Sequence, residues 1–268
     1  MLRSKSKSER SCPACNSNKA FKIGTFKPNA PGEYSSDFDL MDCKCGTIFQ
    51  SPIPSSRDFD TLYRRHTQFD SPEYQDEHKI SSVLEFMTGR LKSITQTQGF
   101  AKNLNILEVG AGYAWMCRAA SEFLPESYRV AQDVTNELSN RTPWVSQYFV
   151  NELDSLPLDE ATKFQVVSMT HVLEHIINPK DFLIQLKKFL SPDGLVFITM
   201  PHRPNGSKSK KKTWESWSYH HVPAHLQYFS KGSLDSLLKG TGLEISYWNT
   251  ESEGGQASEL HLIQKIKI

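Results

Sequence analysis

The sequence predicts an α/β protein with a seven-stranded, mostly parallel sheet that has helices on both faces and a small cysteine-containing module in front of it. Apolar, strand-like runs alternate five times with helical patterns after residue 100, which is typical of a parallel sheet. The first run ends in Glu108 and a small-residue turn at 110–114, and a helical pattern follows at 115–124. Such a turn exposes bare backbone at the start of a helix, where a ligand can approach closely.

The bulk composition indicates a soluble globular chain. It has 268 residues, 38% hydrophobic and 23% charged, which is enough for one large domain plus a small module. The net charge of +1 gives no overall attraction to nucleic acid or to an anionic membrane. No apolar run approaches the ~20 residues of a membrane span, and the basic, polar residues 1–9 do not form a secretory signal. The expected location is the cytoplasm, with reduced thiols.

Four of the five cysteines occur as two close pairs that predict a structural zinc site. Cys12 and Cys15 form a Cys-x-x-Cys knuckle, and Cys43 and Cys45 follow after 27 intervening residues. Four thiolates fill the tetrahedral shell of zinc, so the ion would be structural rather than catalytic. The second pair is Cys-x-Cys, a departure from the usual spacing, and four reduced cysteines in a small core are the alternative. Cys117 is expected to be an ordinary buried core residue.

The chain divides at a proline- and serine-rich hinge at 50–56. The segment at 59–74 is interpreted as an arm packed over the next domain, and apolar residues at helical spacing predict a helix at 77–95. The expected organisation is a flexible tail at 1–11, a zinc-ribbon-like module at 12–54, a linker arm with an N-terminal helix at 55–98, and a larger domain at 99–268.

The larger domain shows strands and helices in regular alternation. Asp133 ends the second strand, where nucleotide-binding α/β folds place a carboxylate for the ribose hydroxyls. Ser230 is a candidate helix N-cap. The predicted strands are 106–109, 128–133, 145–150, 164–169, 195–200, 243–248 and 260–268, the last two antiparallel at the sheet edge. The remaining predicted elements are helices at 115–124, 171–177, 179–190 and 230–239, and a turn at 191–194.

Five sequence blocks give the chain a specific resemblance. They are ILEVGAGYA at 106–114, VAQD at 130–133, FQVVSMTHVLEHIINP at 164–179, LSPDGLVFITMP at 190–201 and HLQYFSKGSLDSLLKGTGLEI at 225–245. The chain resembles class I S-adenosylmethionine-dependent methyltransferases that carry a short zinc-ribbon-like module, which implies a Rossmann-like fold. Glu108 before the glycines separates this family from dinucleotide dehydrogenases. Ala114 stands where the family has its third glycine.

The resemblance also implies a cofactor, S-adenosyl-L-methionine. Gly110 and Gly112 would let the backbone approach its methionine portion, and Asp133 would accept both ribose hydroxyls. The alternatives are a plain tight turn at Gly112, a helix cap at Asp133 and a solvated loop acid at Glu152. The full set of expected cofactor contacts is Glu108, Gly110, Gly112, Tyr113, Asp133, Glu152 or Leu153, Thr170 and His171.

Histidines are the candidate catalytic residues, because methyl transfer by in-line displacement to oxygen or nitrogen commonly needs a base near pH 7. His171 is favoured because it follows the fourth strand, at whose end open α/β sheets bind ligands. Residues 171–175 also match the H-x-x-E-H zinc protease motif. That motif needs a long helix, and only a short one fits here; His175 either lines the pocket or packs inside the domain. The candidate bases are His171, His220, His221 and His225.

The polar segment at 201–223 is expected to cover the acceptor. Its aromatic residues would stack on a sugar or base and the lysines at 208–212 would meet a phosphate; a solvated basic loop is the alternative. The predicted function is methyl transfer to a small-molecule, saccharide or lipid-linked acceptor. The alternatives are an RNA methyltransferase, or a zinc-ribbon protein that docks to RNA or protein through a methyltransferase-like shell.

Overall fold

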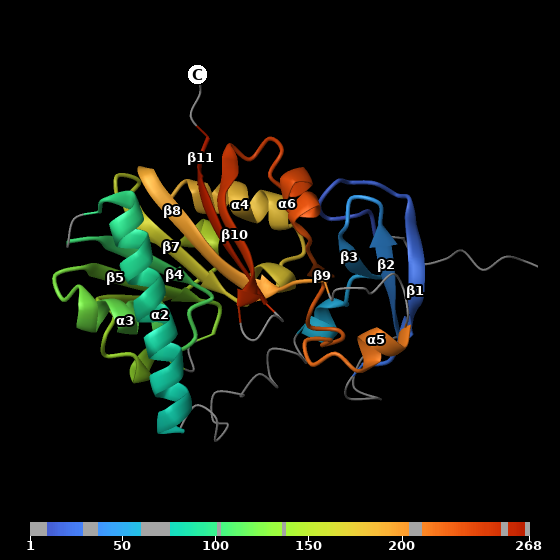
Figure 1. Cartoon of the computed structure of the whole chain (residues 1–268), viewed down its shortest axis with the longest axis horizontal. Coiled ribbons are helices and arrows are strands. Elements are labelled where there is room, and N and C mark those ends of the chain that lie inside the picture. The colour runs from blue at the N-terminus through green and yellow to red at the C-terminus, as the bar shows by residue number, and fades with distance from the viewer. Residues whose placement is uncertain are drawn as a thin grey trace, which may run out of the picture.

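The computed structural model describes residues 10–28, 37–59, 76–100, 103–135, 138–203, 211–252 and 257–265, without the side chains of 251 and 252. Residues 1–9 of the tail predicted at 1–11, residues 60–74 of the arm predicted at 59–74, and the lysines at 208 and 210 lie outside the described residues. A large sheet with helices on both faces lies beside a smaller sheet (Figure 1).

The large sheet has seven strands in the order β10-β11-β8-β7-β4-β5-β6. The central strand β4 (Asn105–Val109) pairs in parallel with β5 (Tyr128–Asp133) and β7 (Phe164–Thr170). The strands β6 (Gln147–Val150) and β8 (Leu190–Pro201) continue the parallel pairing on either side. The chain therefore crosses from one side of β4 to the other between β6 and β7. Open α/β sheets bind ligands at such a switch point.

The two last strands complete the sheet. β11 (Ala257–Gln264) lies between β8 and the edge strand β10 (Leu243–Ser252) and is antiparallel to both. β10 therefore runs in the same direction as the five parallel strands. This topology confirms the predicted Rossmann-like class. The predicted turn at 191–194 lies inside β8. Its residues do not pair with β7, because the pairing passes from Leu190 directly to Leu195.

Helices cover the first face of the sheet through a continuous apolar layer. It is formed by α2 (Glu77–Gln98) and α3 (Trp115–Phe123). Leu91 and Met116 from these helices pack in one buried cluster with Ile106 of β4. None of the helices among the described residues is long and apolar enough to cross a membrane.

The opposite face is covered by α4 (Pro179–Lys187) and α6 (Lys231–Leu237). Leu183 and Leu234 from these helices pack with Leu107 of β4. As the sequence predicts, Ser230 caps α6, since its side chain accepts a hydrogen bond from the Ser233 N–H in a reciprocal capping box.

The predicted helix at 171–177 is wrong. Only a 3₁₀ turn, η5 (Leu173–His175), forms there. His171 has a φ of 54°, which is left-handed and cannot belong to a right-handed helix. The chain therefore changes direction sharply where β7 ends.

The smaller sheet belongs to the zinc-ribbon-like module and has the order β1-β2-β3-β9. Its first three strands are β1 (Ala20–Phe26), β2 (Phe38–Cys43) and β3 (Ile48–Ser51). The fourth, β9 (Gln227–Tyr228), comes from the segment after β8 and pairs antiparallel to β3. The module is therefore completed by a strand that follows β8 of the large sheet in the chain, a pairing that the sequence analysis did not predict.

Candidate active site

The turn after β4 is anchored by Glu108, whose side chain is buried. Its carboxylate accepts hydrogen bonds from the backbone N–H groups of Met116, at 3.2 Å, and Cys117, at 2.9 Å, in the first turn of α3. These N–H groups have no partner within the helix, so a carboxylate is favourable there. Burial raises the pKa of Glu108 to about 7, and the two hydrogen bonds oppose that rise. Glu108 thus fixes α3 beneath the turn.

Three residues of this turn adopt left-handed backbone conformations. Their φ values are 60° at Gly110, 50° at Gly112 and 53° at Ala114. A Cβ on Gly110 would lie 2.5 Å from a Val172 methyl carbon, so glycine is needed for packing as well as for conformation. Ala114 keeps a conformation that glycine would adopt freely, at a cost on the order of 1–2 kcal/mol for a residue with a Cβ.

Asp133 ties the ends of β4 and β5 together. Its Oδ2 accepts from the Gly112 N–H at 2.9 Å, and its Oδ1 accepts from the Thr135 N–H at 3.1 Å. Both donors lie in loops rather than at a helix N-terminus. Each carboxylate oxygen can accept more than one hydrogen bond, so Asp133 keeps capacity for a ligand.

A pocket of about 860 Å³ opens at the ends of β4, β5 and β7. The predicted site residues that line it together are Glu108, Gly110, Gly112, Tyr113, Asp133, Thr170, His171, His221 and His225. The N-terminal half of α2 forms a further wall that the sequence analysis did not assign, with Ser82, Val83, Phe86 and Met87. The sequence did contain a signal for this wall: α2 has apolar residues N-terminal to those that are buried in the core.

His171 occupies the point where β7 meets the pocket. Its ring lies almost parallel to Tyr219, with a centroid separation of 5.6 Å. Its Nδ1 lies 3.2 Å from Oε1 of Glu174, which is fully buried. Left-handed conformations of residues other than glycine cost energy and concentrate at functional sites.

Three predicted residues do not line this pocket. Glu152 is exposed, and Leu153 is buried in the main core. His220 packs edge-on against Phe26 at 4.6 Å, in a separate hollow beside β1, and burial lowers its pKa to about 4. Trp214 is fully buried in the core of the small sheet. Among the described residues, the aromatic side chain that the segment at 201–223 contributes to the pocket is therefore Tyr219.

The four paired cysteines lie together in the module. Cys12 Sγ is 3.6 Å from Cys45 Sγ, and Cys15 Sγ is 3.5 Å from Cys43 Sγ. A tetrahedron with zinc–sulfur bonds of ~2.3 Å has edges of about 3.8 Å, so these separations fit one zinc ion. The contact between Cys12 and Cys45 lowers the pKa of Cys45 and raises that of Cys12, so this pair favours one thiolate, the form that zinc binds. Each close sulfur pair joins the two halves of the motif.

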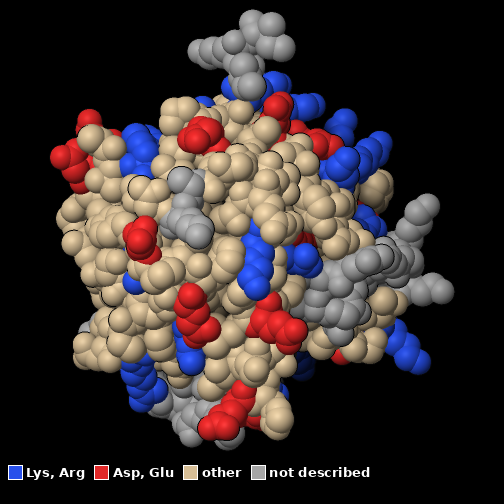
Figure 2. Space-filling view, turned by 60° about the vertical axis from the view of Figure 1, so that its left-hand side comes forward, with Lys and Arg blue, Asp and Glu red and all other residues tan. Residues whose placement is uncertain are grey.

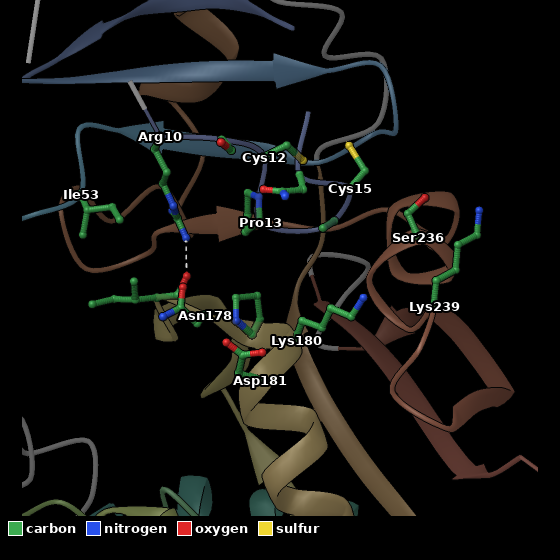
Figure 3. Close-up of a pocket in the computed structure, with 15 residues that line it drawn as sticks. Arg10, Cys12, Pro13, Cys15, Ile53, Asn178, Lys180, Asp181, Ser236 and Lys239 are labelled. Atoms are coloured by element: carbon green, nitrogen blue, oxygen red, sulfur yellow. Dashed lines mark hydrogen bonds between the residues drawn. The ribbon is translucent and has the colours of Figure 1, made fainter. Parts of the chain in front are cut away.

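Arg10, which lies in the tail predicted at 1–11, attaches the chain just ahead of the module to the larger domain (Figure 3). Its guanidinium donates to the carbonyl of Ile177 at 2.8 Å, to Gln227 Oε1 at 2.8 Å and to the carbonyl of Leu226 at 3.2 Å. A second hollow, of about 620 Å³, lies here between the cysteine knuckle and the start of α4. It shares no lining residue with the first pocket. The hydrogen bonds of Arg10 therefore give this region a structural role, which is to hold the start of the module against the larger domain.

The fold and pocket define the class I methyltransferase architecture. Residues 75–247 match a family described as "Methyltransferase domain". The match covers more than half of the chain, which therefore belongs to this methyltransferase family. The predicted class of S-adenosylmethionine-dependent methyltransferase is confirmed.

Two curated relatives are named ubiquinone biosynthesis O-methyltransferase. One, from Bartonella tribocorum, is 24% identical over 140 residues, covering 50% of this chain and 53% of that protein. The other, from Leptothrix cholodnii, is 22% identical over 191 residues, covering 65% of this chain and 76% of that protein. The chain thus spans about half the length of the first relative.

Two solved structures share the fold at low sequence identity. One is 1,6-didemethyltoxoflavin-N1-methyltransferase from Burkholderia thailandensis, with a TM-score of 0.57, 12% identity and coverage of 90% of this chain and 99% of that chain. The other is the plantazolicin methyltransferase BpumL, with a TM-score of 0.55, 16% identity and coverage of 78% and 92%. Both contain S-adenosylhomocysteine.

Proposed function

We propose that this protein transfers the methyl group of S-adenosylmethionine to a small-molecule, saccharide or lipid-linked acceptor. The observation that carries the proposal is that the glycine turn, Asp133 and His171 line one and the same pocket. Thr170 Oγ1 is buried there without a hydrogen-bond partner among the described residues, which suits a polar ligand. The S-adenosylhomocysteine bound in similar structures supports the same cofactor.

The pocket residues divide between the cofactor and the acceptor. Gly112 and Asp133 would hold the methionine and ribose portions, respectively. S-adenosylmethionine supplies an activated methyl group when bound, so the chain has to align the acceptor with it and exclude water.

His171 is the preferred residue to take the acceptor proton. Glu174 Oε1 accepts from its Nδ1–H in the neutral tautomer, which leaves Nε2 with a lone pair. His221 and His225 also line the cavity and remain candidates for this role, whereas His220 lies elsewhere. Glu152 and Leu153 stay predictions for the adenine end.

We also propose that Cys12, Cys15, Cys43 and Cys45 hold a structural zinc ion. The ion would indirectly stabilise residues 219–226, the segment that would form the acceptor side of the pocket. The module contacts this segment through Gln50. Its Nε2 donates to the carbonyl of Pro223 at 3.1 Å, and its backbone N–H donates to the carbonyl of Leu226 at 2.9 Å. Arg203 adds a two-point ion pair to Asp42 of β2, at 3.0 and 3.2 Å. Loss of zinc would therefore loosen the segment that carries Tyr219 and His225.

The proposed acceptor is a small molecule rather than nucleic acid. On the face that Figure 2 shows, lysine and arginine side chains are interspersed with aspartate and glutamate instead of forming one continuous basic surface. The curated relatives are named for O-methylation, which favours an oxygen acceptor. The toxoflavin enzyme is named for N1-methylation, so nitrogen is the second choice.

Calorimetric titration with S-adenosylhomocysteine tests the proposal. We expect wild-type protein to bind one equivalent, and Asp133→Ala to bind at least about tenfold more weakly, since a charge-assisted hydrogen bond contributes about 1.5–3 kcal/mol. Asp154→Ala, at an exposed acid of a neighbouring loop, is the matched control and should bind like wild type. No binding at millimolar ligand, or equal binding by both variants, would refute the cofactor site.

A further inference from the structure

Glu174, His175 and His225 bring three potential metal ligands together at the end of β7. One ligand atom from each residue lies within 4.8 Å of the other two. Glu174 and His175 belong to η5, whereas His225 comes from the segment just before β9. The two histidines line the methyltransferase pocket. The group is separate from the four cysteines.

Backbone carbonyls orient both imidazole rings. Nδ1 of His175 lies 2.9 Å from the carbonyl oxygen of Ala224, and Nδ1 of His225 lies 2.8 Å from that of Tyr219. A carbonyl oxygen can only accept, so each Nδ1 carries a proton and, in the neutral ring, each Nε2 carries a lone pair. Metal-bound histidines commonly show this arrangement, in which the second ring nitrogen donates to a carbonyl or carboxylate.

Glu174 supplies a carboxyl oxygen without a hydrogen-bond partner to the same cluster. Its side chain is fully buried, and Oε1 is taken by the contact with His171. Its Oε2 has no hydrogen-bond partner within the described part of the chain. Leaving a carboxylate oxygen buried and unpaired is costly, and a cation would remove that cost. The Leu226 N–H donates to the Glu174 carbonyl at 2.8 Å, which holds the segment of His225 against η5.

We propose that Glu174, His175 and His225 bind a divalent first-row transition-metal ion inside the methyltransferase pocket. Two imidazole nitrogens and one carboxylate oxygen suit such metals, whereas magnesium and calcium prefer ligand sets made of oxygen. Three protein ligands leave at least one coordination position open. The grouping also differs from the zinc protease motif, because His171 is hydrogen-bonded to Glu174 and the third ligand comes from a distant segment.

The metal site would define the acceptor class, and this consequence rests on the proposed methyl transfer. An acceptor that offers an oxygen could occupy the open position beside the cofactor turn. Coordination lowers the pKa of a bound hydroxyl, so that His171 Nε2 could take its proton. The oxygen would then form a bond to the methyl carbon as the bond from that carbon to the sulfonium sulfur breaks, with S-adenosylhomocysteine as the leaving group. The preferred acceptor is therefore a hydroxyl compound that can coordinate a metal.

The test is a Co²⁺ titration of protein whose cysteine site already holds one equivalent of zinc. Co²⁺ bound by nitrogen and oxygen absorbs visible light without the strong charge-transfer bands of a thiolate site. Glu174→Gln and His175→Gln each remove one ligand with little change in volume. His78→Gln, at an exposed histidine of α2, is the matched control. Thermal unfolding checks that each variant folds, and S-adenosylhomocysteine binding is measured in parallel.

We expect wild type and His78→Gln to bind one Co²⁺ beyond the zinc, and the two ligand variants to bind it at least about tenfold more weakly. The metal site is overturned if wild type binds no Co²⁺ beyond the zinc, or if all four proteins bind it equally. Co²⁺ binding without S-adenosylhomocysteine binding would keep the metal site and sink the proposed function. The opposite result would keep the function and remove the metal site.

Discussion

Glu108 gives the protein a pH-dependent stability that can be isolated by one substitution. Its carboxyl is buried against the start of α3, and burial raises its pKa from 4.5 to about 7. Glu108→Gln keeps the size of the side chain and removes the titration. It also removes one of the two acceptors, because an amide presents a single oxygen to the N–H groups of Met116 and Cys117.

The magnitude follows from the shift in pKa. A difference of about 2.5 pH units corresponds to roughly 3 kcal/mol at 1.36 kcal/mol per unit. Between pH 4.5 and 7 the native chain holds a proton that the unfolded chain has released, so its free energy of unfolding falls as pH rises. The stabilisation is fully present below pH 4.5 and is lost above about pH 7.

The assay is urea unfolding of wild type and Glu108→Gln at half-unit steps from pH 5 to pH 8. We expect wild type to lose about 2–3 kcal/mol relative to the variant across this range, since part of the shift lies below pH 5. Glu122→Gln, at an exposed carboxylate of the same helix, should leave the pH profile of wild type unchanged. Parallel profiles for wild type and Glu108→Gln would show that the buried carboxyl does not titrate as described.

Three further perturbations test other parts of the molecule. Cys45→Ser should abolish retention of one zinc per chain in elemental analysis and lower the thermal midpoint, while zinc retained by the variant would contradict the four-thiolate site. Trp214→Ala should reduce the free energy of unfolding by about 3–5 kcal/mol because it empties the core that the small sheet shares with the segment before β9. Phe21→Ala, at a ring that is 67% exposed, should change it by less than about 0.5 kcal/mol. Ser230→Ala should cost about 1 kcal/mol in chemical unfolding, and a neutral result would remove the capping role of Ser230.

The elements that carry the fold could be predicted because their signals are local. The apolar run at β7 and the glycines after β4 depend on neighbouring residues and on backbone sterics, which the sequence states directly. The side of the pocket formed at the ends of β4, β5 and β7 follows from these elements, since parallel strands bring their carboxyl ends to one edge of the sheet. The helix expected at 171–177 failed for a local reason too: the periodic pattern is present, but His171 takes a left-handed conformation that periodicity does not reveal.

The sequence by itself determined the α/β class, the four-cysteine site and the turn from Glu108 to Ala114. Tertiary structure alone decided that β9 completes the small sheet and that His225 joins Glu174 and His175. The reason is that the first set depends on spacings of a few residues, whereas the second joins segments about 50 residues or more apart. Such pairings form only when both segments pack on the same core, and the sequence of neither segment indicates which distant segment it will contact.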